Sequence, residues 1–186
     1  MTTGTIGVIA AIAGASVLVA WLYNRLVRLR NLVRSSWSDI DVMLRKRYDL
    51  VGNLVETVKG YAAHEKTTLQ GVTDARARAM RAAGPGAKGK EEDALGERVA
   101  SLLAVAEGYP DLKASDSFLT LQKQLAELEN GIEYARRYYN AVVRDYNSAT
   151  ETFPSTLVAS LFRFTPGEFF RLESPKEGER TDVRLS

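Results

Sequence analysis

The chain contains no cysteine, a single histidine and no segment with the alternating apolar–polar pattern of a β-strand. The lack of cysteine excludes disulfide bonds, thiolate nucleophiles and lipid attachment through sulfur. The single histidine, His64, precedes Glu65, but Thr68 occupies the position where a zinc-protease helix needs its second histidine. A histidine-rich metal site within one chain is therefore excluded.

A catalytic constellation is also missing. No serine has a histidine base in a familiar arrangement, and the glycine-rich stretch 84–89 lacks the Lys-Ser/Thr of a phosphate loop. The net charge is only +2, which gives no case for nucleic-acid binding. We therefore predict that the protein is not an enzyme, takes no cofactor or metal, and does not bind nucleic acid.

Charged side chains are absent from residues 6–23. Such a run of about 18 residues, rising about 1.5 Å each, spans a hydrocarbon core of about 30 Å. We predict a transmembrane helix here, preceded by a short tail over residues 1–5. Its predicted anchor residues are Ile6, Val8, Ile9, Ile12, Val17, Leu18, Val19, Trp21 and Leu22.

Four arginines follow this run, and no acidic residue occurs among them. They are Arg25, Arg28, Arg30 and Arg34, and they can attract anionic lipid headgroups at about 1 kcal/mol each. The positive-inside rule then predicts an N-terminus outside and a cytoplasmic domain after a single pass. The alternative is a cleaved signal peptide with a site near Ala13–Ala15. That alternative lacks a cationic start, and the apolar run continues beyond it.

Small residues recur at four-residue spacing inside the predicted span. Such faces let helices approach closely in lipid. The predicted helix-association residues are Gly7, Ala11, Gly14 and Ala15. The alternative is that alanine and glycine are simply common in membrane anchors.

Apolar residues spaced three and four apart run from Leu26 to Ala62, which predicts a long amphipathic helix with a kink at Gly52 or a break near His64. The stretch 84–90 is predicted as a loop, and a last long helix is predicted between Ser115 and Pro154. The fold class is all-α: a transmembrane helix followed by an antiparallel up-and-down four-helix bundle over residues 24–152.

Aromatic residues are concentrated in the segment 153–172, which we predict to lie at the membrane interface. The predicted interfacial residues are Phe162, Phe164, Phe169 and Phe170. The alternative is that these rings cap the open end of the bundle. The polar residues 173–186 are predicted to be disordered.

Two sets of polar residues invite a structural role. The charged residues around Asp41, Arg45 and Asp49 form either a buried polar cluster or a solvated face of helix ion pairs. Three Tyr-Asn pairs, at 23–24, 139–140 and 146–147, are predicted to gather near the membrane end of the bundle as structural anchors.

Several of these blocks occur in the order found in one family. They include Tyr23–Val27, Trp37–Val42, Arg47–Ala62, Tyr109–Ala114 and the later Tyr-Asn pairs. In these blocks the chain resembles the LemA family of bacterial membrane proteins. The resemblance implies an N-terminal single-pass anchor in a cell or internal membrane and an antiparallel four-helix bundle, with no agreed activity. Gly52 departs from the family, which usually has proline there.

We expect a non-enzymatic, membrane-anchored helical scaffold that self-associates or recruits protein partners, with the lipid membrane itself as a further partner. One alternative is a membrane-remodelling or lipid-surface-binding oligomer, for which the aromatic segment is the main support. Another is a signalling adaptor or a subunit of a membrane enzyme.

Overall fold

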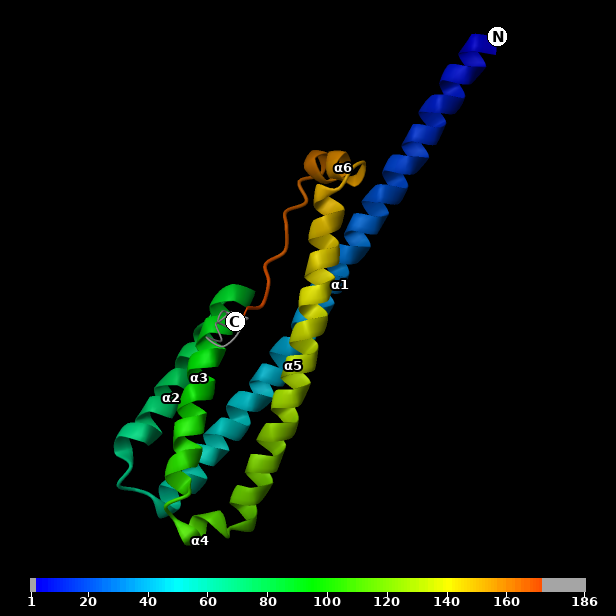
Figure 1. Ribbon diagram of the computed structural model, residues 1–186. Helices are drawn as coiled ribbons and strands as arrows, with labels where there is room; N and C mark the ends of the chain where they lie inside the picture. Colours follow the sequence, from blue (N-terminus) through cyan, green and yellow to red (C-terminus); the bar gives the residue numbers. More distant parts are fainter. Residues whose placement is uncertain (1–2, 172–186) are drawn as a thin grey trace, which may run out of the picture. The chain divides into compact units, whose positions relative to one another are not determined.

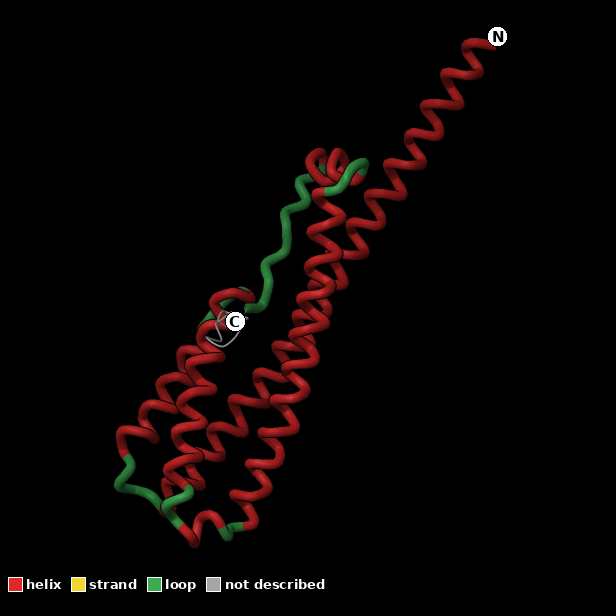
Figure 2. The backbone as a smooth tube through the Cα atoms, viewed as in Figure 1, coloured by secondary structure: helices red, strands yellow, loops and turns green. Residues whose placement is uncertain are grey.

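A computed structural model describes residues 3–171. The described residues form α-helices joined by short connections, with no strand among them (Figures 1 and 2). The helices are α1 (Thr3–Tyr61), α2 (Lys66–Arg81), α3 (Pro85–Ala106), α4 (Pro110–Lys113), α5 (Asp116–Glu151) and α6 (Ser155–Leu161). This confirms the predicted all-α class.

The first helix continues from the apolar run without interruption and ends at Tyr61, just before His64. The helix α1 is not interrupted at Gly52. A Cβ at Gly52 would lie 3.4 Å from the guanidinium of Arg76, which is about van der Waals contact. Arg76 donates a hydrogen bond from Nε to the Tyr48 carbonyl at 2.7 Å.

The described chain divides into two compact units. Unit 1 comprises residues up to 40 together with 134–169, and therefore holds the start of α1, the end of α5 and α6. Leu22 and Leu26 of α1 form its core with side chains of α5, α6 and the segment that follows. Their buried partners are Tyr146, Ala149, Val158, Ala159 and Phe164.

Unit 2 comprises residues 41–133 and, among described residues, 170 and 171. It draws segments from four long helices, because the end of α1, all of α2 and α3, and the start of α5 belong to it. The helices α2 and α3 lie side by side (Figure 1). The finer prediction of an up-and-down four-helix bundle stays a prediction. The short helix α4 was not expected from the sequence.

The loop predicted over 84–90 is wrong, because α3 already begins at Pro85. Proline suits the first turn of a helix, where its missing N–H is not needed. Gly84 precedes it at φ 81°, a conformation that glycine adopts without strain. Gly89 lies inside the helix. A Cβ at this position would lie 2.0 Å from the Arg171 carbonyl oxygen, so the close approach of that carbonyl requires glycine. The glycines here serve a cap and a close contact.

The remaining boundaries follow the sequence. The last long helix begins at Asp116, directly after the predicted cap Ser115, and ends at Glu151 before Pro154. The predicted disordered tail, residues 173–186, lies outside the described residues.

Candidate membrane-interface site

The first part of α1 is the most unusual surface of unit 1. It is long and apolar enough to cross a membrane, and almost none of it is covered by the rest of the described chain. Eight of the nine predicted anchor residues are exposed, and Val17 is 70% exposed. Leu22 differs, because it is buried in the core of unit 1. The uncovered apolar surface thus ends where the packed core of unit 1 begins.

The four arginines lie on α1 just after this apolar surface. Arg25, Arg28 and Arg34 are exposed, and the Arg25 guanidinium lies 5.8 Å from the centroid of the Trp21 ring. Arg30 is half-buried and lies 4.9 Å from the centroid of Phe164. Three of the four cations are therefore free to reach a headgroup, whereas Arg30 stacks on a core aromatic ring.

The short helix α6 packs against α1 near Leu22. Its inner face contributes Val158 and Ala159 to the core of unit 1. Phe162, just after the helix, contacts the ring of Tyr23 with centroids 4.7 Å apart. Two grooves flank this contact, one lined by residues of α1 and Phe162 and one that also includes Phe153 and Pro154.

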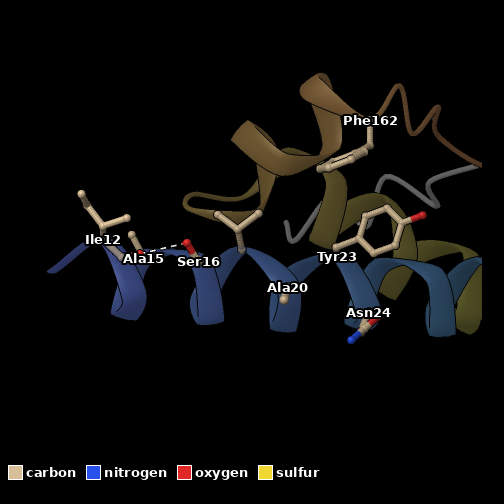
Figure 3. A pocket seen from close by; sticks show the side chains of 8 residues that line it. Ile12, Ala15, Ser16, Ala20, Tyr23, Asn24 and Phe162 are labelled. Carbon is tan, nitrogen blue, oxygen red and sulfur yellow. Dashed lines mark hydrogen bonds between the residues drawn. The ribbon is translucent and has the colours of Figure 1, made fainter. Parts of the chain in front are cut away.

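The first groove is shown in Figure 3. It has a volume of about 590 Å³ and is lined mostly by apolar atoms. The contacting rings of Phe162 and Tyr23 both line it, and Ala15 and Ala20 contribute small side chains from α1 (Figure 3). One of the predicted helix-association residues, Ala15, lines this groove.

The four predicted interfacial phenylalanines separate into different environments. Phe162 is exposed and Phe169 is half-buried. Phe164 and Phe170 are buried, in unit 1 and unit 2 respectively. The capping alternative therefore describes Phe164 and Phe170 better, because packed rings cannot also face lipid. The interfacial role stays a prediction for the other two.

The segment 163–169 is fastened to α5 by hydrogen bonds from side chains. The hydroxyls of Tyr139 and Tyr146 donate to the carbonyls of Glu168 and Thr165, at 2.7 and 2.9 Å. The Asn147 amide pairs with the backbone of Gly167, donating at 3.0 Å and accepting at 2.7 Å. Two of the three Tyr-Asn pairs thus supply structural anchors, as expected, and the segment that they hold by hydrogen bonds is the chain after α6.

Burial around these hydroxyls disfavours their charged form. It raises the pKa of Tyr139 to about 12, with a smaller contribution from Glu168. Burial also raises the pKa of Tyr146, although Arg30 and Arg34 oppose the change. Both hydroxyls therefore stay protonated and remain donors throughout the physiological range.

The small residues of the span have open surroundings. A Cβ added at Gly7 or Gly14 would meet no atom within 4 Å. Ala11 is exposed as well, so the described part of the chain leaves this face open for another helix. Helix association through this face stays a prediction.

A buried ionic cluster lies in unit 2. The Arg47 guanidinium contacts two carboxylates: Nη1 lies 2.8 Å from Glu92 Oε2 and Nε lies 2.7 Å from Glu129 Oε1. Glu92 is 2% exposed and also accepts a hydrogen bond from the Tyr48 hydroxyl. Lys88 is buried beside them and donates to the Ala79 carbonyl at 3.2 Å.

Burial raises the pKa of Glu92, and Arg47 opposes the change by favouring the carboxylate. Burial raises the pKa of Glu129 as well. The charged residues singled out in the sequence take both of the alternative forms. Asp41 and Arg45 form an exposed ion pair at 2.7 Å, as a solvated face predicts, whereas Arg47 is buried. The partners of Arg47 gave no signal, because they lie far away in the sequence.

These features define a class: a helical protein whose first helix carries an uncovered, membrane-length apolar segment beside a packed helical unit. A comparison with known families agrees. The model of the LemA family matches residues 36–185, which is more than half of the chain. The chain belongs to the LemA family.

Individual relatives are more distant. The chain is 25% identical over 175 residues to magnetosome protein MamQ 2 of Paramagnetospirillum magneticum, and 25% identical over 174 residues to MamQ of Magnetospirillum gryphiswaldense. Both matches cover 80% of this chain and 64% of the relative, so the chain spans somewhat less than two thirds of their length. It is 26% identical over 164 residues to protein LemA of Metamycoplasma hominis, covering 88% of this chain and 74% of that protein.

Proposed function

We propose that the protein is a non-enzymatic scaffold anchored in a membrane by α1, which self-associates and recruits protein partners through its helical units. The carrying observation is the uncovered apolar start of α1. Exposing so many large aliphatic side chains to water is costly at about 25 cal/mol per Å², and a bilayer removes that cost. Continuity of α1 from Thr3 to Tyr61 then ties the helices of both units to the anchor.

Sidedness is part of this proposal. The cluster of Arg25, Arg28 and Arg34 on the exposed surface after the span supports a cytoplasmic position for the packed helices, with the N-terminus outside. Reporter fusions at the C-terminus, one active only in the cytoplasm and one only outside it, test this orientation. A reporter that is active only outside would overturn it.

Self-association is proposed to use the small-residue face of the span. In lipid, glycine and alanine allow two backbones to approach closely, which a larger side chain prevents. We expect the protein in mild detergent to cross-link into oligomers, and Gly7→Leu with Gly14→Leu to reduce them. A matched change on the same helix, Val8→Leu with Val17→Leu, is expected to leave them unaltered. A wild-type chain that is strictly monomeric would refute this step.

Recruitment of protein partners is tested by affinity capture of the full-length chain from native membranes, followed by mass spectrometry. Partners that are lost when the Arg47–Glu92 pair is disrupted would map to unit 2. Capture of nothing beyond copies of the chain itself would limit the function to self-association.

A second candidate is contact with the lipid surface. It is favoured by the exposed apolar residues around α6, which nothing in the described chain covers.

A further inference from the structure

The region around α6 has no charged side chain from Phe153 to Phe162. Leu157 and Leu161 lie one turn apart on α6 and are 63% and 72% exposed, and Phe153, in the turn before the helix, is 76% exposed. Phe162 adds a further exposed ring. Phe153, Leu157, Leu161 and Phe162, which we name the α6 stripe, are an exposed apolar set of unit 1 outside the span.

The place of the α6 stripe along α1 is set by contacts. Val158 and Ala159, on the opposite face of α6, pack in the core with Leu22 and Leu26. The grooves on either side of α6 are lined by α1 residues up to Asn24 and Leu29. The helix α6 therefore lies beside the end of the uncharged run, where the arginines begin.

That level of α1 is where the hydrocarbon of a bilayer gives way to headgroups. A short helix with an apolar outer face and no charge is stable at this boundary, where its side chains enter the acyl region. The described part of the chain leaves the side chains of the α6 stripe exposed, so these apolar side chains need an external partner.

We propose that α6 is an interfacial helix that inserts the α6 stripe into the same bilayer that α1 crosses. The occupant of this surface is lipid, and the groove lined by α1 and Phe162 receives an acyl chain. The groove suits this occupant, because its lining is mostly apolar, it includes the small side chains of Ala15 and Ala20, and its volume is about 590 Å³ (Figure 3). The proposal rests on the proposed anchoring of α1.

Continuity with the span argues for lipid over protein. The exposed side chain of Val19 lines the same mostly apolar groove as Phe162, so apolar surface continues from the span to the end of α6 along this groove. Insertion would give the protein a second contact with the membrane and set how deeply α1 sits in it.

The absence of cysteine makes a direct test possible, because single cysteines can be labelled with the environment-sensitive dye NBD. The full-length variants are Leu157→Cys and Leu161→Cys on the stripe, Ile12→Cys in the span and Tyr134→Cys as the control. Tyr134 is 76% exposed, like Phe153, and belongs to unit 1. It lies about 25 Å along α5 from the end of that helix, at about 1.5 Å per residue.

Each labelled protein is reconstituted into phosphatidylcholine–phosphatidylglycerol vesicles, with and without bromine on the acyl chains. We expect the probes on the stripe to shift to the blue and to be quenched by the brominated chains at roughly half or more of the Ile12 level, as an interfacial depth requires. The Tyr134 probe is expected to stay unquenched.

Two results would overturn the proposal while leaving the anchor intact. In the first, Ile12 is quenched but the stripe is quenched no more than Tyr134, so α6 lies in water. In the second, the stripe probes are blue-shifted but unquenched, so a second copy or another protein covers them. An unquenched Ile12 probe would instead refute the anchored state, and both proposals with it. Circular dichroism of each labelled variant checks that its helix content equals that of the unmodified chain.

Discussion

Replacement of Arg47 by methionine is expected to destabilise unit 2 strongly. The change removes the ion partner that lies 2.8 Å from Glu92 and leaves the Tyr48 hydroxyl as the hydrogen-bond donor to that carboxylate. Because Glu92 is 2% exposed, water cannot replace the guanidinium. Breaking one partner out of a buried pair costs about 3–5 kcal/mol. Glu129 loses the same partner, but its side chain is 45% exposed and can be hydrated.

Arg45→Met is the matched control. Arg45 lies on the same helix and pairs with Asp41 at 2.7 Å, but its side chain is 75% exposed. Such a pair contributes about 0–1 kcal/mol. Thermal unfolding of both variants in detergent is followed by far-ultraviolet circular dichroism. The melting temperature of Arg47→Met should lie roughly 6–12 °C or more below that of the wild type, and that of Arg45→Met within a few degrees of it. Equal losses in the two variants would refute the argument from burial.

Acid conditions provide an independent check on the cause. Without Arg47, the buried Glu92 carboxylate has less to favour its charged form, so its pKa rises further above the ordinary 4.5. A group whose pKa is raised by folding binds protons more tightly in the folded state, so the protein loses stability as pH rises through that window. The cost of Arg47→Met should therefore be smallest near pH 4.5 and grow towards neutrality. Arg47→Met with Glu92→Met should be at least about 1 kcal/mol more stable than Arg47→Met alone.

Three further changes probe the packing. Gly89→Ala places a Cβ 2.0 Å from a backbone carbonyl oxygen and should lower the free energy of chemical unfolding by about 1–3 kcal/mol. The control is Gly60→Ala, where the new Cβ meets nothing within 4 Å. It should be neutral or stabilising by up to about 1 kcal/mol. Folding raises the pKa of Tyr139 to about 12, so the wild-type protein should lose about 2–3 kcal/mol of stability as the pH rises from 10 to 12. Tyr139→Phe should remove this loss, because phenylalanine does not titrate. The control Tyr134→Phe should leave the loss unchanged. Asn147→Ala should cost about 1–3 kcal/mol and speed amide exchange after α6; unchanged exchange would contradict its fastening role.

The features that were predictable depend on local pattern. An uncharged run of membrane length and apolar residues spaced three and four apart identify α1 and α5, and Pro154 sets a limit to α5. These signals arise because a helix repeats its faces over a few residues, so the chain alone reports them.

The features that were missed depend on contacts between distant residues. Arg47 meets Glu92 only after α1 and α3 are packed, and no spacing in the sequence encodes that meeting. The glycines of 84–89 look like a loop because composition does not distinguish a flexible glycine from one that admits the Arg171 backbone. Likewise, Phe162 and Phe164 are the same residue type and lie two residues apart in the sequence, and only packing makes Phe164 buried and Phe162 exposed.

Family membership and the membrane-length apolar segment are independent observations, because the family match begins at residue 36, after that segment and the four arginines. The α6 stripe connects them. It lies inside the matched region, yet the inner face of α6 packs on Leu22 and Leu26, which precede that region. Exposure of the phenylalanine and leucine side chains of the stripe is energetically unfavourable in water and favourable at the edge of a bilayer. The proposed anchoring of α1 accounts for this composition, because it puts the helix on which α6 packs at the edge of a bilayer at that level.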